Sequence, residues 1–231
     1  MSNPIDPRKV FIVLPAYNEQ AVITTVVREL QGFGYSIVVV DDGSQPPLTP
    51  LLAGMPVYLL RHRVNLGQGA ALQTGISFAG SKNADYIVSF DADGQHRAED
   101  IARLLDELNE GGLDIVTGTR FMEGSGHNMT KGRKIVIQTA RYLNWFFTGL
   151  LLSDAHNGLR AMTGEAAKKI QLQESGMAHA TEFISIIRKQ KLRFKEVPVQ
   201  VRYTEYSRSK GQSAWSGFRI LFDILLNKIF K

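Results

Sequence analysis

Two aspartates, Asp91 and Asp93, flank one alanine directly after an apolar run, in the segment FDADGQH at 90–96. Carboxylate oxygens are hard ligands, the kind that Mg²⁺ or Mn²⁺ prefers, and a divalent ion held there could bridge two phosphates. An isolated Asp-Ala-Asp-Gly sequence is explained equally well as a turn that serves the backbone. Because this one follows a strand-like run, its position favours the metal site.

A second group of polar residues follows two other apolar runs, in LPAYNE at 14–19 and VDDGS at 40–44. Tyr17 offers an aromatic face, and Glu19 and Asp42 offer carboxylates. Together they could stack against a planar base and hydrogen-bond to it. Each segment by itself is an ordinary strand-to-turn sequence, so the prediction depends on their lying side by side.

The elements that would position these residues alternate along the chain. Short apolar runs predict strands, and apolar residues at helical spacing predict helices between them. The predicted strands are 10–14, 36–40, 57–60, 86–90, 115–117 and 196–203; the predicted helices are 21–30, 68–79, 98–109, 134–152 and 214–231. This alternation predicts an α/β fold with a mostly parallel sheet covered by helices. Ligands of such sheets bind beyond the carboxyl ends of the strands, where Tyr17, Asp42 and Asp91 fall.

Composition narrows the function classes. The chain has 231 residues, 44% of them hydrophobic, which suits one domain with a single sizeable core. It has no cysteine, which excludes disulfides and thiolate chemistry. The net charge of +5 suits an anionic partner, but the basic run at 188–195 lacks stacking aromatics and is typical of a solvated face, so no nucleic acid is expected. Residues 1–9 lack a secretion signal, and no apolar run reaches the roughly 18 residues of a spanning helix.

The order of several motifs resembles the family 2 inverting glycosyltransferases of the GT-A fold. The resemblance is strongest to the branch of dolichol-phosphate mannose synthase and bacterial polyprenyl-phosphate sugar transferases. Besides the three segments above, the motifs are NLGQGAALQTG at 65–75, TGTRF at 117–121, DAHNGLR at 154–160 and EVPV at 196–199.

This resemblance implies a role for each matching residue. Pro15, Tyr17, Glu19 and Asp42 match residues that contact the base and ribose. Asp91, Asp93 and Gln95 match residues that bind the Mg²⁺ or Mn²⁺ ion and the diphosphate. Arg120 matches an arginine that faces phosphate. The acceptor phosphate falls to Arg133, Arg208, Lys210 and Ser213, although Ala214 stands where the family pattern has lysine. Gln68 also replaces a common lysine, and two interpretations stay open: a donor-site residue whose lost charge alters donor affinity, or a solvent-facing residue in a glycine-shaped turn.

The implied reaction moves a sugar, with inversion, from a nucleotide diphosphate sugar to a polyprenyl phosphate, which would be undecaprenyl phosphate in a bacterium. The expected single domain has a nucleotide-sugar half at about 8–120 and an acceptor half at about 121–213. Polar residues recur every three or four positions from 214 to 231, which predicts an amphipathic helix there. That helix could pack on the core or lie in a membrane interface, and the aromatic segment 142–147 poses the same choice. A peripheral enzyme is expected at the cytoplasmic face of the membrane, held by the lipid surface or by a small integral membrane partner.

Two rival functions stay open. A transferase of the same fold acting on a sugar or protein hydroxyl would need a carboxylate base such as Asp154 or Glu182. An inactive nucleotide-sugar-binding scaffold would bind donor and metal without turnover. His96, His156 and His179 do not have the spacing of a zinc site, and packing or support of neighbouring groups is the favoured interpretation. The sequence identifies neither the base and sugar of the donor nor the oligomeric state.

Overall fold

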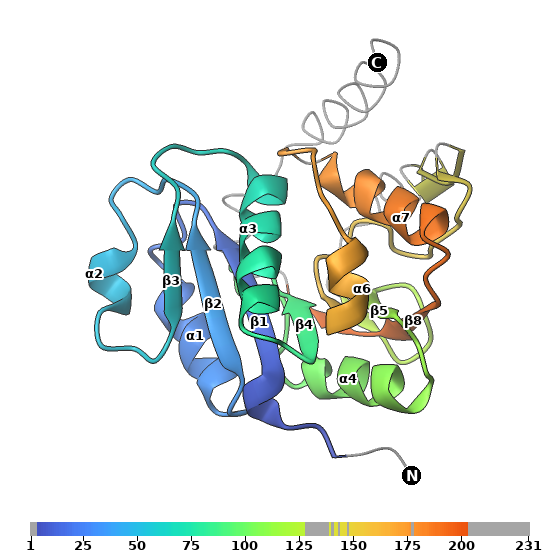
Figure 1. Ribbon diagram of the computed structural model, residues 1–231, viewed down its shortest axis with the longest axis horizontal. Coiled ribbons are helices and arrows are strands. Elements are labelled where there is room, and N and C mark those ends of the chain that lie inside the picture. The colour runs from blue at the N-terminus through green and yellow to red at the C-terminus, as the bar shows by residue number, and fades with distance from the viewer. Residues whose placement is uncertain are drawn as a thin grey trace.

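The computed structural model describes residues 4–127, 139, 141–142, 144–146, 148–176 and 178–202. Its centre is a seven-stranded sheet with the order β3-β2-β1-β4-β7-β5-β8 (Figure 1). The strands are β1 Val10–Ala16, β2 Ser36–Asp41, β3 Tyr58–Arg61, β4 Tyr86–Ser89, β5 Ile115–Thr119, β7 Arg160–Thr163 and β8 Phe194–Pro198. Strand β7 is antiparallel to both neighbours, and the other pairs are parallel. The predicted α/β domain with a mostly parallel sheet is therefore confirmed.

Helices cover both faces of the sheet because successive side chains of a strand point to opposite sides. Val10, Ile12 and Leu14 of β1 pack with α1 (Ile23–Gln31) and α4 (Asp100–Glu110). Phe11 and Val13 pack with α3 (Gln68–Ser81), α6 (Gly164–Lys169) and α7 (His179–Lys189) on the other face. The remaining short elements are η1 Pro7–Lys9, α2 Thr49–Leu52, β6 Gly126–His127 and β9 Gln200–Val201.

The second half differs most from the sequence prediction. Strand β7 and helices α6 and α7 were not predicted. Strand β7 has no clear apolar run, because it has four residues and begins with a charged one, Arg160. The strand predicted at 196–203 is two strands: β8 belongs to the large sheet, whereas β9 pairs with β6 in a separate two-stranded sheet. In the predicted helix 134–152, the described residues are helical up to Thr148, and the helix ends at Gly149, whose φ is 69°.

Two other predictions concern surfaces. The basic side chains of the run at 188–195 are exposed, as expected of a solvated face. The predicted helix 214–231 lies outside the described residues. Within the part of the chain that the structure describes, no helix is long and apolar enough to cross a membrane.

Candidate donor and metal site

Strands β2, β1 and β4 lie side by side and run in the same direction, so the residues that follow them share one edge of the sheet. Tyr17 follows β1, Asp42 follows β2 and Asp91 follows β4 shortly after Ser89. Tyr17 is 48% exposed at this edge. The fold therefore brings the predicted base-binding and metal-binding segments to the same edge.

Asp42 is buried and its carboxylate is held by the turn that precedes α3. Its Oδ1 accepts a hydrogen bond from the backbone N–H of Leu66 at 2.9 Å, and its Oδ2 accepts one from Gly67 at 2.8 Å. His62 Nδ1 lies 2.7 Å from Asp42 Oδ1, and His62 Nε2 lies 3.0 Å from the Thr74 hydroxyl. Sequence reasoning did not identify His62, because it lies outside every recognised motif.

Asp91 is held between two side chains. Gln68 Nε2 donates to Asp91 Oδ1 at 3.1 Å, and His96 Nε2 lies 3.1 Å from Asp91 Oδ2. Burial works against ionisation of this carboxyl, but His96, Arg160 and His179 outweigh it and keep the pKa of Asp91 below its ordinary value. Gln68 is partly buried and contacts Asp91, which favours the site interpretation over a solvent-facing turn residue.

Asp93 has the opposite electrostatic environment. Its carboxylate accepts hydrogen bonds from Gln95, at 3.0 Å from the backbone N–H and 2.6 Å from Nε2. Burial, followed by the charge of Asp91 and a smaller effect of Glu19, raises the pKa of Asp93 to about 6. A divalent cation bound beside Asp91 and Asp93 would favour the ionised form of Asp93, which the charge of Asp91 disfavours.

The donor set fits Mg²⁺ or Mn²⁺ bound together with phosphates. Among the described residues, no group of three or more histidine and carboxylate side chains is arranged to hold a metal ion by itself. A cation at Asp91 and Asp93 would thus complete its coordination with substrate oxygens, which is how Mg²⁺ is usually held beside phosphates.

Two residues of the motif at 154–160 complete the surroundings of Asp91. A Cβ atom on Gly158 would lie 2.0 Å from Asp91 Oδ2, so only glycine leaves room for the carboxylate. Arg160 is buried, with Nε donating to the Asn157 carbonyl at 3.0 Å and its guanidinium 4.4 Å from the ring centre of Phe183. Burial lowers the pKa of Arg160 to about 10, so it stays cationic and favours ionised Asp91. Sequence reasoning did not single out Arg160, although a charged residue next to the apolar residues of a strand is a signal for a buried functional group.

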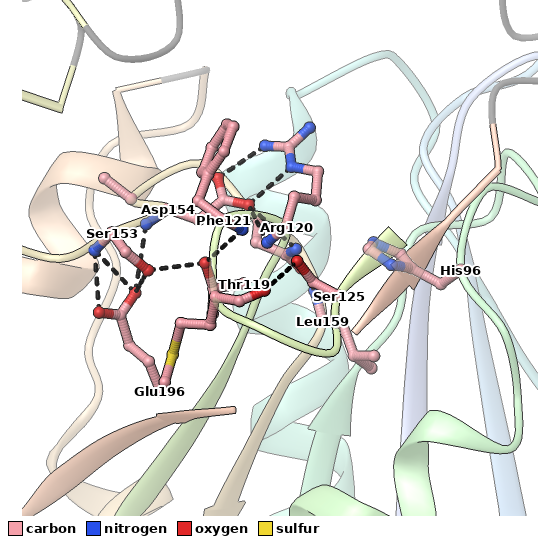
Figure 2. Close-up of polar contacts among 12 residues, drawn as sticks. His96, Thr119, Arg120, Phe121, Ser125, Ser153, Asp154, Leu159 and Glu196 are labelled. Carbon is pink, nitrogen blue, oxygen red and sulfur yellow. Dashed lines mark hydrogen bonds and ion pairs between the residues drawn. The ribbon is translucent and has the colours of Figure 1, made fainter. Parts of the chain in front are cut away.

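Arg120 lies in a neighbouring polar network (Figure 2). Its Nε and Nη2 contact the two oxygens of Asp154 at 2.6 and 2.7 Å. Glu196 Oε2 accepts a hydrogen bond from the backbone N–H of Ser153 at 2.8 Å, and Glu196 Oε1 accepts one from the Ser153 hydroxyl at 2.8 Å. The Ser153 hydroxyl also lies 2.6 Å from Thr119 Oγ1. The motifs TGTRF, DAHNGLR and EVPV therefore meet in one hydrogen-bonded group.

The sequence profile described as "Glycosyl transferase family 2" matches residues 11–171, more than half of the chain. The chain belongs to glycosyl transferase family 2. The matched range includes the DADGQH segment, strand β2, helix α3 and all of β1 except Val10.

Relatives of this family 2 chain are similar over almost its whole length. The protein MJ1222 of Methanocaldococcus jannaschii is 37% identical over 99% of this chain and 96% of its own. The UDP-N-acetylglucosamine–dolichyl-phosphate N-acetylglucosaminyltransferase of Methanococcus voltae is 31% identical over 96% of this chain and 97% of its own. The polyprenol monophosphomannose synthase of Mycolicibacterium smegmatis is 29% identical over 92% and 83%. These relatives confirm the branch of family 2 that the motifs predicted.

A solved structure shares the fold of this family 2 chain. It is glucosyl-3-phosphoglycerate synthase of Mycobacterium tuberculosis, in complex with Mn²⁺, UDP and glucosyl-3-phosphoglycerate, with a TM-score of 0.72. The match covers 94% of this chain and 77% of the other at 18% identity. The predicted GT-A fold is thereby confirmed.

The predicted acceptor residues of this family 2 chain, Arg133, Arg208, Lys210 and Ser213, lie outside the described residues. The end of the described chain nevertheless contacts two residues next to the candidate metal site, His96 and Gln95. Strand β9 pairs with β6, Val201 forms a bridge with His96, and the Arg202 N–H donates to the Gln95 carbonyl at 2.9 Å.

Proposed function

We propose that this protein transfers a sugar from a nucleoside diphosphate sugar to a polyprenyl phosphate, with inversion at the anomeric carbon. The product would be a lipid-linked sugar donor for glycan or glycoconjugate assembly. The observation that carries the proposal is the near full-length similarity to a dolichyl-phosphate N-acetylglucosaminyltransferase, in a chain that retains Asp91 and Asp93 beyond β4. The acceptor is undecaprenyl phosphate if the host is bacterial.

The donor would lie across the carboxyl ends of β1, β2 and β4. Pro15, Tyr17, Glu19 and Asp42 would contact the base and ribose, and Gln68 would lie near the diphosphate. Asp91, Asp93 and Gln95 would hold Mg²⁺ or Mn²⁺. When bound, the cation neutralises charge on the departing nucleoside diphosphate.

In the proposed reaction, an oxygen of the lipid phosphate attacks the anomeric carbon from the face opposite the diphosphate. A new carbon–oxygen bond forms while the bond to the β-phosphate oxygen breaks, and the electron pair leaves with the nucleoside diphosphate. A phosphate monoester is already anionic at neutral pH, so this acceptor does not require a strong general base. Arg120 is proposed to stabilise the charge on the departing diphosphate.

The acceptor phosphate is proposed to bind Arg133, Arg208, Lys210 and Ser213. Arg133 is six residues beyond His127, and Arg208 is six residues beyond Arg202. Six extended residues reach about 20 Å, so both arginines are within chain reach of the site beside Gln95. Guanidinium groups suit this task because they bind phosphate oxygens in pairs.

The surroundings of two carboxylates favour a phosphate over a hydroxyl acceptor. Asp154 would be a candidate base for a hydroxyl, but it is buried and its two oxygens face the Arg120 guanidinium. Burial opposes its ionisation, yet Arg120 and Asn157 keep the pKa of Asp154 below its ordinary value. Glu182, the other candidate, accepts hydrogen bonds from the backbone N–H groups of Gln173 and Glu174 at 2.9–3.0 Å.

Contact with the membrane is proposed to be peripheral and at the cytoplasmic face, where nucleotide sugars are made. Three aromatic side chains preceding Gly149 are exposed: Tyr142 by 58%, Trp145 by 49% and Phe146 by 77%. The basic end of α7 is near, since Arg188 Nη1 donates to the Thr148 carbonyl at 2.8 Å. Exposed aromatics beside cationic groups suit a lipid headgroup region. The helix predicted at 214–231, or a small membrane partner, would add to this contact.

The test is transfer of radiolabel from UDP-, GDP- and dTDP-sugars to polyprenyl phosphate, counted in the organic phase with Mg²⁺ or Mn²⁺ present. Label from one donor, abolished by EDTA and by Asp93→Ala, is the expected result and names the sugar. Label entering a soluble hydroxyl acceptor instead would overturn the lipid acceptor. Donor binding without turnover on any acceptor would support the scaffold alternative.

A further inference from the structure

The segment 65–69, which consists of the turn before α3 and the first two residues of α3, contacts both carboxylates of the proposed donor site. The backbone N–H groups of Leu66 and Gly67 hold Asp42, and the side chain of the next residue, Gln68, donates to Asp91. Asp42 follows β2 and Asp91 follows β4, with β1 between these strands in the sheet. This short segment therefore connects two carboxylates that follow different strands.

The backbone of Glu174 and Ser175 packs closely against this segment. The Gly69 N–H donates to the Ser175 carbonyl at 2.8 Å. A Cβ on Gly67 would lie 2.3 Å from that same carbonyl oxygen, and a Cβ on Gly69 would lie 2.0 Å from the carbonyl oxygen of Glu174. Such close backbone contact fixes the start of α3, and with it the position from which Gln68 reaches Asp91.

His96 contacts the other oxygen of Asp91, Oδ2, and is itself held in place by its surroundings. Its side chain is 5% exposed, lies edge-on to the Phe90 ring at 5.6 Å and is bridged through its backbone to Val201. Gly158 closes the third side, because any larger residue would overlap Asp91 Oδ2. Asp91 keeps 28% of its side-chain surface exposed. The carboxylate is thus fixed in orientation while one part of it stays open.

We propose that Gln68 and His96 are positioning residues that fix the Asp91 carboxylate for binding of a divalent cation with a diphosphate. The proposal rests on the metal-dependent donor site described under the proposed function. Groups that hold a metal-binding carboxylate or histidine in place commonly contribute about 10- to 100-fold to metal affinity. Neither residue needs to touch the cation or the sugar for this effect.

The test uses the full chain and Mn²⁺, whose binding is followed by electron paramagnetic resonance, alone and with UDP or GDP. Gln68→Met and His96→Phe keep the approximate size of the side chain and remove the N–H donor. Each is expected to weaken Mn²⁺ binding about tenfold. His96→Gln, which can present an Nε2 donor to Asp91, is expected to restore much of the affinity. Gln171→Ala, at an exposed position outside the site, is the matched control and should bind Mn²⁺ like the unaltered chain.

A double variant separates positioning from a general loss of structure. Because both side chains act on the same carboxylate, Gln68→Met with His96→Phe should differ from the sum of the single effects, whereas unrelated sites add. Wild-type Mn²⁺ affinity in both single variants, with melting temperatures unchanged, would overturn the proposal. So would strict additivity, or failure of the unaltered chain to bind Mn²⁺ with either nucleotide. Mn²⁺ binding that depends on Gln68 and His96 without any lipid glycosylation would instead overturn the proposed acceptor and keep this inference.

Discussion

Arg120 and Asp154 form a buried ion pair in which two guanidinium nitrogens meet two carboxylate oxygens at 2.6 and 2.7 Å. Their side chains are only 9% and 0% exposed. The backbone N–H of Arg120 also donates to Asp154 at 3.1 Å, so the pair joins the end of β5 to the loop before β7. Arg120, which was expected to face phosphate, is therefore held in place by Asp154, which was a candidate general base.

Removing one partner of this pair should destabilise the fold strongly. Asp154→Ala is expected to lower the free energy of unfolding by about 3–5 kcal/mol, because it leaves a buried guanidinium without its counter-charge. Urea unfolding measures the change. Glu107→Ala, which breaks the more exposed pair with Lys195, is the control and should cost at most about 1 kcal/mol. Equal effects of the two changes would contradict a buried pair at Arg120.

Asp93 should lower stability above pH 6 when no cation is present. Its folded-state pKa of about 6 exceeds the ordinary 3.8, so the folded protein holds this proton more tightly than the unfolded chain. The resulting stabilisation is complete below about pH 4 and is lost as the pH rises through 6. Asp93→Asn should therefore stabilise the metal-free protein at pH 7.5, by up to about 3 kcal/mol, and much less at pH 4.

Thermal unfolding with and without Mn²⁺ checks this prediction. Mn²⁺ should raise the melting temperature of the unaltered chain and should have a much smaller effect on Asp93→Asn. The Asp93→Asn variant should also lose activity. Asp106→Asn, on the exposed face of α4, is the control for loss of one surface carboxylate. If Asp93→Asn were less stable than the unaltered chain at pH 7.5, the electrostatic interpretation would be wrong.

His156 should make the protein sensitive to acid. Burial is the largest cause that lowers the pKa of His156 to about 4, so the folded protein keeps it neutral where the unfolded chain binds a proton. Stability from this residue is present above about pH 6.5 and is lost as the pH falls toward 4. His156→Gln should flatten the loss of unfolding free energy between pH 6.5 and 4, as measured by urea unfolding. An unchanged slope would count against a buried neutral histidine.

Gly158→Ala should damage the site through Asp91. The new Cβ would lie 2.0 Å from Asp91 Oδ2, so the carboxylate or the loop before β7 must move. Mn²⁺ affinity and transfer activity should fall at least tenfold, in line with misplacing a metal ligand. Gly80→Ala meets no atom within 4 Å and lies in helix α3, so this control should keep its activity and gain about 0.5–1 kcal/mol of stability.

The exposed aromatics before Gly149 should bind lipid. Replacing Trp145 and Phe146 together by serine is expected to reduce co-sedimentation with anionic phospholipid vesicles several-fold, without a change in melting temperature. Leu51→Ser with Val64→Ser removes two other exposed apolar side chains, 41% and 62% exposed, and should leave vesicle binding unchanged. Equal vesicle binding by all three proteins would place the membrane contact elsewhere.

The amino-acid sequence was sufficient to predict the parallel strands β1 to β4 and the sheet edge where the candidate donor residues lie. Apolar runs ending in LPAYNE, VDDGS and DADGQH predict parallel strands, and parallel strands put their carboxyl ends at one edge. The side chains concerned are close in sequence to the strand that places them. For this reason local patterns were sufficient for Tyr17, Asp42, Asp91 and Asp93.

The side chains that surround those residues became known from the three-dimensional structure. Gln68 and His62 reach Asp91 and Asp42 across 23 and 20 positions of the chain, and the Arg120–Asp154 pair spans 34. Strand β7 carries an arginine in a four-residue segment, so local pattern gave no sign that it would lie between β4 and β5. Such contacts arise when segments distant in sequence pack together, so the spacing of residues within one segment does not predict them.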